Sequence, residues 1–420
     1  MPPRAQLPAV PRLTYLRIKN YRTLRDVEFR DLTPLTVLIG PNGSGKSTVL
    51  DALDFLAEAV RGNLVGAWEK RNRFAGMRTR GSEGNIEFEL IITGPSAFPQ
   101  LYYALTIGEE EGKILVMAEK LIEHETHSDI RLAYLLTKSE GWYTHFEIFR
   151  LNKGDFIPEN AFVSNLESVF DGNSSREDSS SIEILNSIDN PLKEQAAYLI
   201  TALSSYRYIH LTDDHLKGYS DAGPREKLSP NGDNLPNVLY YLHTRHPETL
   251  AKITAQMRKW VPSLAGIMPE ITSDERILLR FKDAEFEKPL PAQYMSDGTM
   301  RLAALLTLLY EPGATGLLGL EEPENELHPQ LLAYLAEELI AAADTRQLLV
   351  ATHSPALLNA LAPEQVWIMH RGADGYSQAT RTADLPGIAA MVEEGTPLGY
   401  LWSRNFFDVG NPLDLPTPVK

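Results

Sequence analysis

The segment "GPNGSGKST", Gly40 to Thr48, constrains this 420-residue chain more than any other. It carries the full pattern G-x-x-x-x-G-K-[ST], which ends in Gly45, Lys46 and Ser47. The apolar run "LTVLIG" comes directly before it, and "STVLDALDFLAEAV" follows with apolar residues at helical spacing. This order of strand, loop and helix predicts a loop that binds phosphate through backbone N–H groups and a helix N-terminus. The alternative is a glycine-rich turn without a ligand.

A phosphate loop that supports hydrolysis needs groups that hold a metal ion and activate water. Lys46 would reach the β- and γ-phosphates, and the hydroxyl of Ser47 would bind Mg²⁺. The stretch "TGLLGLEEPENELHP" adds a buried strand that ends in Glu321 and Glu322. We expect the first acid to hold Mg²⁺ through water and the second to orient or deprotonate the attacking water.

Another apolar strand, "RQLLVATHSP", ends in His353 and Ser354. A histidine at this point can donate a hydrogen bond to a γ-phosphate. The alternative is a satisfied core or capping histidine. The phosphate loop and the acidic strand end elsewhere in the chain favour the first interpretation.

A polar turn precedes the apolar helix in "YMSDGTMRLAALLTLLY". Ser296, Asp297 and Gly298 form this turn. The turn fits a helix N-cap, in which Ser or Asp satisfies free backbone N–H groups. The same N–H groups could face a phosphate that belongs to another molecule, and the two interpretations are compatible.

The order of these four motifs resembles that of the ABC-type ATPases. Within them, the chain is most similar to the RecF/SMC-like group, which includes the overcoming-lysogenization-defect (OLD) ATPases and short AAA-type ATPases of prokaryotic defence loci. "YLRIKNYRTLRDVEF" resembles the opening strand pair of that group, "EEPENELHP" its DEPEN-x-LHP signature, "THSP" its switch motif and "YMSDGTMR" its version of the ABC signature. The middle of the chain matches only at "SPNGDNL".

The resemblance implies an enzyme that hydrolyses ATP with Mg²⁺. It assigns Glu322, His353 and Lys46 to catalysis, and Ser47 and Glu321 to the metal. Glu321 stands where the group has Asp, which adds a methylene to the metal arm, and no convincing glutamine loop is found. The nucleotide would be bound by the phosphate loop of one subunit and the signature turn of a second, namely by Asn42, Gly43, Ser44, Gly45, Lys46, Ser47, Thr48, Ser296, Asp297 and Gly298.

The implied fold is α/β: an ABC-type P-loop ATPase head with a mixed sheet, a flanking antiparallel β-meander and a mainly helical insertion. Short β-rich runs between residues 85 and 151 predict the meander. We expect an N-terminal ATPase lobe at 1–155, the insertion at 156–289 and a C-terminal ATPase lobe at 290–420. The polar, Ser-rich segment 171–190 predicts a mobile loop within the insertion.

Composition narrows the location and the partners. The chain has no cysteine, no apolar run long enough to span a bilayer and no signal peptide, so we expect it in the cytoplasm and not in a membrane. A net charge of −16 opposes a surface that is generally adapted to nucleic acid. The segment from Arg61 to Arg80 is basic, however, and would bind nucleic acid or an acidic partner, or be an ordinary solvated loop.

Four histidines of the middle region lie near acids and raise the alternative of a second, metal-dependent site. Their spacing fits no defined ligand pattern, which favours ordinary surface histidines. They are His124, His127, His210 and His215.

Three functions remain open from the sequence. The preferred one is an ATPase whose heads form a homodimer or higher oligomer on ATP and control an effector protein from a neighbouring gene, or nucleic acid, in defence against phages or plasmids. A RecF-like role in DNA repair is the alternative. The energising subunit of an ABC transporter is the third, and the long separation between Ser47 and Ser296 speaks against it.

Overall fold

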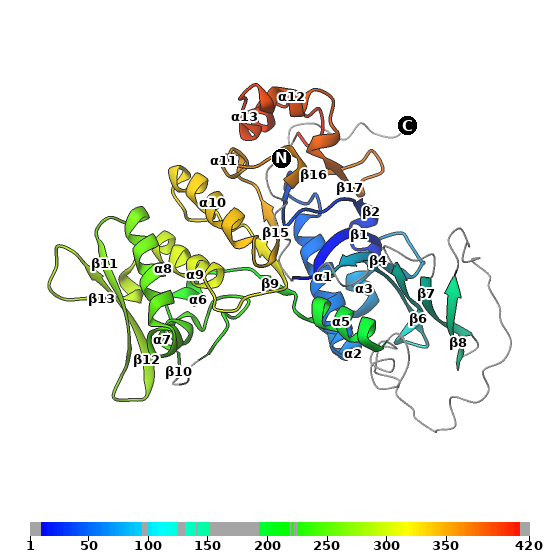
Figure 1. Ribbon diagram of the computed structural model, residues 1–420, viewed down its shortest axis with the longest axis horizontal. Helices are drawn as coiled ribbons and strands as arrows, with labels where there is room; N and C mark the ends of the chain where they lie inside the picture. Colours follow the sequence, from blue (N-terminus) through cyan, green and yellow to red (C-terminus); the bar gives the residue numbers. More distant parts are fainter. Residues whose placement is uncertain are drawn as a thin grey trace.

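The computed structural model describes residues 10–94, 100–124, 131–139, 142–151, 193–218, 220–221, 223 and 225–411. The mobile loop expected at 171–190 lies outside these residues. Figure 1 shows an antiparallel sheet on one side, a central sheet flanked by helices, and a separate lobe built around α7 and α8 on the other side.

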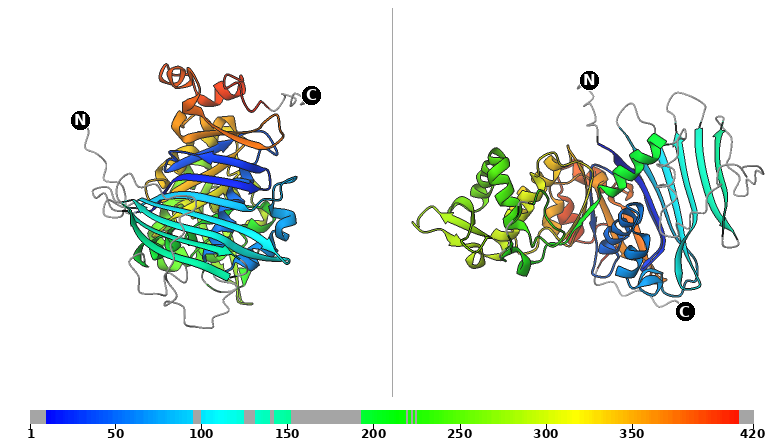
Figure 2. Two further views of the ribbon diagram at one scale, coloured as in Figure 1. Left: turned by 90° about the vertical axis from the view of Figure 1, so that its right-hand side faces the viewer. Right: turned by 90° about the horizontal axis from the view of Figure 1, so that it is seen from below.

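The first sheet is antiparallel and has the strand order β2-β1-β4-β5-β6-β7-β8. Buried and partly buried residues alternate strictly along β4, as expected for a strand with one face in a core. Figure 2 shows these strands side by side at one end of the molecule. The strands are β1 (Arg12–Tyr21), β2 (Leu24–Phe29), β4 (Ile86–Thr93), β5 (Gln100–Glu110), β6 (Lys113–His124), β7 (Arg131–Ser139) and β8 (Trp142–Leu151).

The second sheet has the order β17-β16-β3-β15-β14-β9 and is parallel except at β17. Its inner strands β3 and β15 are buried along their whole length, which matches their continuous apolar sequences. The carboxyl ends of its parallel strands therefore meet at one edge. The strands are β3 (Leu35–Ile39), β9 (Arg207–Ile209), β14 (Leu317–Glu321), β15 (Gln347–Thr352), β16 (Val366–Arg371) and β17 (Ser377–Arg381).

Helices cover both faces of the parallel sheet. Helix α1 (Lys46–Val60) lies between the two sheets, and α9 (Asp297–Leu309) and α10 (Leu332–Ala342) belong to the core on the opposite face. The remaining helices outside the separate lobe are α2 (Leu64–Lys70), α3 (Arg73–Met77), α5 (Lys193–Ser204), α11 (Pro355–Leu358), α12 (Ile388–Glu393) and α13 (Leu398–Ser403).

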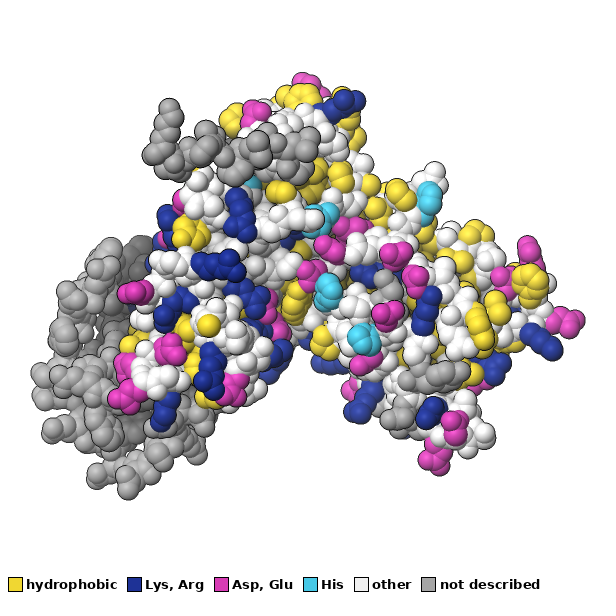
Figure 3. Space-filling model, turned by 180° about the vertical axis from the view of Figure 1, so that it is seen from behind, with side chains coloured by type: hydrophobic (Ala, Val, Ile, Leu, Met, Phe, Trp, Pro, Cys, Tyr) yellow, Lys and Arg dark blue, Asp and Glu magenta, His cyan; other side chains and the backbone are white. Residues whose placement is uncertain are grey.

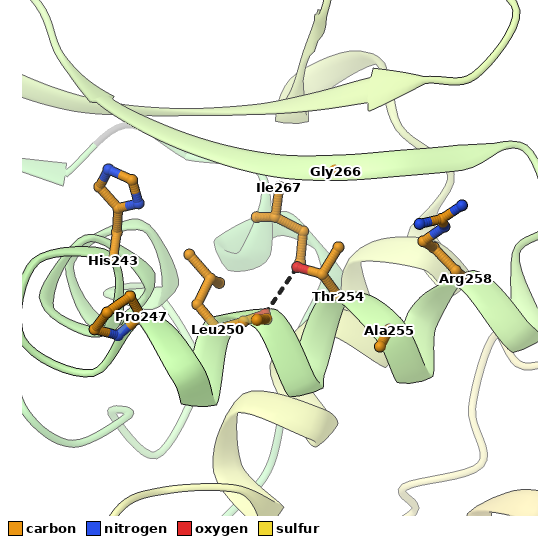
Figure 4. Close-up of a pocket in the computed structure, with 9 residues that line it drawn as sticks. His243, Pro247, Leu250, Thr254, Ala255, Arg258, Gly266 and Ile267 are labelled. Carbon is orange, nitrogen blue, oxygen red and sulfur yellow. Dashed lines mark hydrogen bonds between the residues drawn. The ribbon is translucent and has the colours of Figure 1, made fainter.

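The separate lobe combines helices with a small sheet. The helices are α6 (Asp213–Leu216), α7 (Leu235–Arg245) and α8 (Pro247–Trp260), and the strands are β10 (Ser220–Asp221), β11 (Leu264–Ile271), β12 (Arg276–Asp283) and β13 (Leu290–Pro291). An open pocket of about 330 Å³ lies between α8 and β11. Figure 4 shows Leu250, Thr254 and Arg258 of α8 facing Ile267 of β11 across it.

The side chain of Gln347 joins the two large sheets. Its Oε1 accepts a hydrogen bond of 2.7 Å from the backbone N–H of Leu13, and its Nε2 donates one of 2.7 Å to the carbonyl of the same residue. Gln347 is fully buried, so both amide groups find partners that replace water. The start of the chain is thereby fixed to a strand that lies 334 residues later.

The α/β head with a mixed sheet and a flanking antiparallel sheet is confirmed. The expected insertion, 156–289, contains helices as predicted, but its strand β9 is an edge strand of the parallel sheet. It also contains the β11–β12 hairpin, which the sequence analysis does not predict. The boundaries of the three expected segments stay a prediction. Among the described residues, no helix is long and apolar enough to cross a membrane.

Candidate functional site

The phosphate loop connects β3 to α1, as its sequence predicts. Helix α1 begins after Gly45, whose φ of 106° lies in the left-handed region, and no side chain caps its first N–H groups. A Cβ atom at Gly45 would lie 2.5 Å from Ser377 Oγ, so a larger residue does not fit. The uncapped N-terminus of α1 is therefore free to accept an anion.

The other loop residues surround this N-terminus. Asn42 and Ser47 are exposed, Ser44 is buried and Thr48 is partly buried in the first turn of α1. The carbonyl of Gly43 accepts a hydrogen bond of 2.9 Å from Nε of Arg371, at the end of β16. No motif in the sequence marks Arg371 as part of the site.

Lys46 folds back over the loop that precedes it. Its Nζ donates hydrogen bonds of 2.8 Å to the carbonyl of Gly40 and 3.1 Å to that of Pro41. Burial lowers the pKa of Lys46 to about 8, although the charge of Glu322 opposes the shift. The ammonium group is thus poorly compensated where it lies, which favours an incoming anion.

Glu321 lies at the carboxyl end of β14. Its Oε2 accepts a hydrogen bond from the hydroxyl of Tyr208 and lies 2.9 Å from Nδ1 of His210. Burial alone would raise the pKa of Glu321, but hydrogen bonds from His210, Ser47 and Tyr208 lower it to about 2. The carboxylate is therefore ionised and in contact with the predicted metal-binding hydroxyl of Ser47.

Glu322 and His353 meet at the ends of neighbouring strands β14 and β15. Glu322 Oε1 lies 3.2 Å from His353 Nε2, and its Oε2 accepts a hydrogen bond of 2.8 Å from Asn325. Burial lowers the pKa of His353, with a further contribution from the positive charge of Lys46. A neutral imidazole can donate a hydrogen bond from one ring nitrogen to the neighbouring carboxylate, and His353 can therefore hold Glu322 in place.

Two buried residues that the sequence analysis misses fix this pair. Glu324 Oε1 accepts hydrogen bonds of 2.5 Å from Thr352 Oγ1 and 2.9 Å from the backbone N–H of His353. Arg301 of α9 donates one of 2.9 Å to the carbonyl of Glu322, a residue with a φ of 44°. The sequence does offer a sign of Glu324, because it is the third acid of "EEPEN". An acid so close to a buried strand needs hydrogen-bond partners if it is buried.

The signature turn is bound to its own subunit in three ways. Ser296 Oγ accepts a hydrogen bond of 3.2 Å from the backbone N–H of Thr299, as an N-cap does. Asp297 forms an ion pair of 2.6 Å with Lys217. A Cβ atom at Gly298 would lie 2.4 Å from the carbonyl of Glu326, so packing within the subunit already requires glycine there.

The structure brings together Lys46, Ser47, Glu321, Glu322 and His353 at the carboxyl edge of the parallel sheet. In the described part of the chain, the contacts of Ser296, Asp297 and Gly298 are with their own helix, with Lys217 and with Glu326. Figure 3 shows acidic and histidine side chains close to one another near the middle of the face of the molecule that it draws. The roles of these residues stay predictions.

Much of the basic segment 61–80 serves the fold. Arg71 is buried against three acids of α1, and Arg61 donates hydrogen bonds to the carbonyls of Ser204 and Tyr206. Arg73 is exposed and lies over the ring of Trp68. On the face drawn in Figure 3, Lys and Arg side chains are interspersed with acidic and apolar ones. The surface available for nucleic acid is therefore smaller than the sequence suggests.

Of the four histidines considered for a second site, two have described side chains. His215 contacts Thr212, and His210 contacts Glu321. Neither His124 nor His127 has a side chain among the described ones. The described residues contain no group of three or more His, Asp or Glu arranged to hold a metal.

The donor set at the sheet edge fits a magnesium nucleotide. Ser47 and Glu321 provide a hydroxyl and a carboxylate, which are hard oxygen ligands of the kind that Mg²⁺ prefers. Lys46 and the uncapped start of α1 supply positive charge for phosphates. The residues present can therefore hold both the Mg²⁺ ion and the phosphates of the nucleotide.

Comparison with known proteins agrees with this geometry. Residues 35–359 match the family model described as "AAA domain, putative AbiEii toxin, Type IV TA system". An OLD nuclease of Thermus scotoductus is 48% identical over 111 residues, which are 26% of this chain and only 21% of that protein. The DNA replication and repair protein RecF of Chlorobium luteolum is 23% identical over 313 residues, covering 68% of this chain and 72% of the relative.

A solved structure supports the fold. An SMC head bound to the C-winged helix domain of ScpA has a TM-score of 0.52 and 12% sequence identity, with 88% of this chain and 97% of that one covered. At this identity the likeness concerns the fold alone. The family match over most of the chain shows that this protein belongs to that AAA-domain family, with an OLD nuclease and RecF among its relatives and the fold of an SMC head.

Proposed function

We propose that this chain binds and hydrolyses ATP, and that two of its heads join around ATP and separate after hydrolysis. The observation that carries the proposal is the pair of Glu322 and His353, 3.2 Å apart, beside Lys46 and the carboxylate of Glu321. All four side chains lie at one edge of a parallel sheet, where ligands of α/β proteins bind.

The chain's own residues divide the work as follows. The N-terminus of α1 and Lys46 would bind the phosphates, while Ser47 and Glu321 would hold Mg²⁺, which neutralises phosphate charge when it is bound. Glu322 accepts the proton of the attacking water. The single N–H of a neutral His353 would lie on Nε2, where it orients Glu322 in the free protein and would turn to the γ-phosphate when the nucleotide is bound.

The contacts around Glu322 support its role as the base. Its backbone is bound on both sides, since its N–H donates to the carbonyl of Ala351 over 2.8 Å and its carbonyl accepts from Arg301. A base that is held on a rigid element loses less freedom when the reacting water arrives. The position of Glu322 is therefore set before the nucleotide binds.

The substitution Glu322→Gln tests this function. The amide cannot accept the proton, so the turnover rate should fall by about 10²–10⁴-fold while the affinity for ATP stays near that of the wild type. Phosphate release and binding of a fluorescent ATP analogue measure the two quantities. Asn325→Ala is the matched control, because it removes only the amide that contacts Glu322. Near-normal hydrolysis by Glu322→Gln would assign the base elsewhere.

The finer proposal is that ATP-driven head closure controls an effector in defence against phages or plasmids. The description of the matching family, which refers to a toxin system, supports it. The same variant tests it, because Glu322→Gln should hold the complex with a neighbouring gene's product in its ATP-bound state. An effector activity that does not respond to ATP or to this variant would contradict control by the heads.

A role in DNA repair is the second candidate. It is favoured by the match to RecF, which extends over 68% of this chain. The two candidates differ in the ligand of the closed heads. ATP-dependent binding of the Glu322→Gln variant to DNA, without any effector protein, would favour repair.

A further inference from the structure

Strand β9 runs beside the strand that carries the acidic pair. It pairs in parallel with β14, with Ile209 opposite Leu320 and Tyr208 opposite Gly319. The next residue along each strand is then His210 on one and Glu321 on the other. A short segment from the middle of the chain thereby reaches the proposed metal site.

Alternate residues of this segment face the same side. Side chains two apart on a strand lie on one face, which places Tyr206, Tyr208 and His210 together. The hydroxyl of Tyr206 donates a hydrogen bond of 3.0 Å to the carbonyl of Leu50 in α1. The other two side chains both reach Oε2 of Glu321. The row thus connects the helix of the phosphate loop with the acid at the end of β14.

The direction of these hydrogen bonds follows from the chemistry. An ionised carboxylate only accepts hydrogen bonds, so the hydroxyl of Tyr208 and Nδ1–H of His210 are the donors. Both bind Oε2, and Ser47 makes a further hydrogen bond to the same carboxylate. A Glu side chain has one more rotatable bond than Asp, and two donors on one oxygen remove that freedom.

His210 is itself fixed by the stretch "SPNGDNL". Its backbone N–H donates a hydrogen bond of 2.8 Å to the carbonyl of Pro230. The turn that contains Pro230 is closed by a 2.8 Å hydrogen bond from the N–H of Ser229 to Oδ1 of Asn234. The side chain of His210 is 51% exposed, so burial does not account for its position.

We infer that Tyr208 and His210 are positioning residues that hold the carboxylate of Glu321 for the divalent cation. This inference rests on the proposed function, in which Glu321 is the metal arm. It gives a purpose to the longer side chain at this position, since Tyr208 and His210 orient a carboxylate that would otherwise be free to rotate. It also gives the "SPNGDNL" stretch a place in the site.

The test measures the affinity for the metal and not the rate. Mn²⁺ is titrated, with detection by electron paramagnetic resonance, into protein saturated with a non-hydrolysable ATP analogue. Tyr208→Phe and His210→Ala should each weaken the binding of Mn²⁺ by about 10–100-fold, as the loss of partners of metal ligands typically does. Thermal unfolding should change little, because Phe retains the ring of tyrosine and His210 is half exposed.

Two further variants separate positioning from other effects. His210→Asn places an amide N–H near the position of Nδ1 and should restore most of the affinity that His210→Ala loses. His215→Ala removes a histidine of the same segment that contacts Thr212, and should bind Mn²⁺ like the wild type. An Asn variant as weak as the Ala variant would overturn the role of the hydrogen bond.

The Glu321→Ala background completes the experiment. If Glu321 is the metal arm, this variant binds Mn²⁺ weakly, and Tyr208→Phe or His210→Ala weakens it no further. Unchanged Mn²⁺ binding by Glu321→Ala would refute the metal arm, and with it part of the proposed function. Weak binding by Glu321→Ala but wild-type binding by the other two would refute the positioning role alone. A loss at His210 that persists without Glu321 would mean direct metal contact.

Discussion

Lys46 illustrates the cost of a residue kept ready for a ligand. Only 5% of it is exposed, and its hydrogen bonds go to two backbone carbonyls that carry no full charge. Burial therefore lowers its pKa to about 8. Below this pH the buried positive charge reduces the stability of the nucleotide-free protein.

The substitution Lys46→Met should stabilise the nucleotide-free protein at pH 7. The folded-state pKa lies below the unfolded value of about 10.4, so the folded protein loses its proton first and the wild type gains stability between pH 8 and about 10.4. The gain from Lys46→Met should be at most about 3 kcal/mol at pH 7 and should vanish near pH 10.4. Urea unfolding at several pH values measures it.

Lys288, an exposed lysine, provides the control. Lys288→Met should leave the difference from the wild type independent of pH. If the stability difference between Lys46→Met and the wild type is also independent of pH, burial of the Lys46 charge does not destabilise the protein. Lys46→Met should also lose ATP binding in either case, because the cation for the phosphates is gone.

At the residue scale, motifs identify the groups that touch the nucleotide but not those that hold them. Lys46, Ser47 and Glu322 belong to short patterns with a chemical purpose, and the structure places them at one edge. Tyr208 belongs to no such pattern, and Arg301 ends the signature stretch "YMSDGTMR" without a role that the motif assigns to it. Their importance comes from strand pairing and helix packing between distant segments, which one sequence does not reveal.

At the scale of elements, a buried guanidinium group joins α1 and α2, in addition to the ion pairs of Lys70 with α1. Arg71, at the end of α2, forms ion pairs of 3.1, 2.7 and 2.5 Å with Asp51, Asp54 and Glu58 of α1. Only 3% of its side chain is exposed. The guanidinium fork matches acids that recur on one face of the helix.

The substitution Arg71→Met should cost up to about 3–5 kcal/mol of stability, because it takes the buried cation away from three mostly buried carboxylates. Their remaining partners are Arg22, Tyr21 and the more exposed Lys70. Arg73→Met should cost less than about 1 kcal/mol, since Arg73 and its partner Glu69 are both exposed. Denaturant unfolding of the two variants measures the difference. Equal costs would mean that Arg71 acts as an ordinary surface charge.

Long elements with a clear period are predicted from the sequence, and short ones are not. The apolar spacing of α1 and the alternation in β4 identify both. Strand β9 has only three residues, and its identity depends on β14 beside it. Strand β11 includes Pro269 and shows no regular alternation of buried residues, so tertiary pairing with β12 determines it.

At the scale of the whole molecule, the proposed site is divided between two subunits. Ser296 is exposed at the start of α9, where its contacts in the described residues are within its own helix. This exposure is what a surface that closes on a second head requires. The fold class is predictable from the sequence because the order of the motifs resembles that of the ABC-type ATPases. The order of the strands and the mode of assembly are not predictable from those motifs.

A mixture of two inactive variants tests the division. Lys46→Ala should prevent binding of ATP in its own loop, and Ser296→Arg should leave binding intact but block closure. Heterodimers then contain one complete site, so mixing should restore part of the ATPase activity. A chain that carries both substitutions, mixed with Lys46→Ala, is the control and should stay inactive. Inactive heterodimers in the first mixture would contradict a shared site.

The two hydrogen bonds between the side chain of Gln347 and the backbone of Leu13 affect folding during synthesis. They join residues 334 positions apart, and β3 pairs with β15 and β16, which emerge from the ribosome long after β3. Contacts of such sequence separation form slowly. The apolar strand β3 therefore lacks these two partners while the residues between them are made, and the nascent protein depends on its early antiparallel sheet, or on a chaperone, to avoid aggregation.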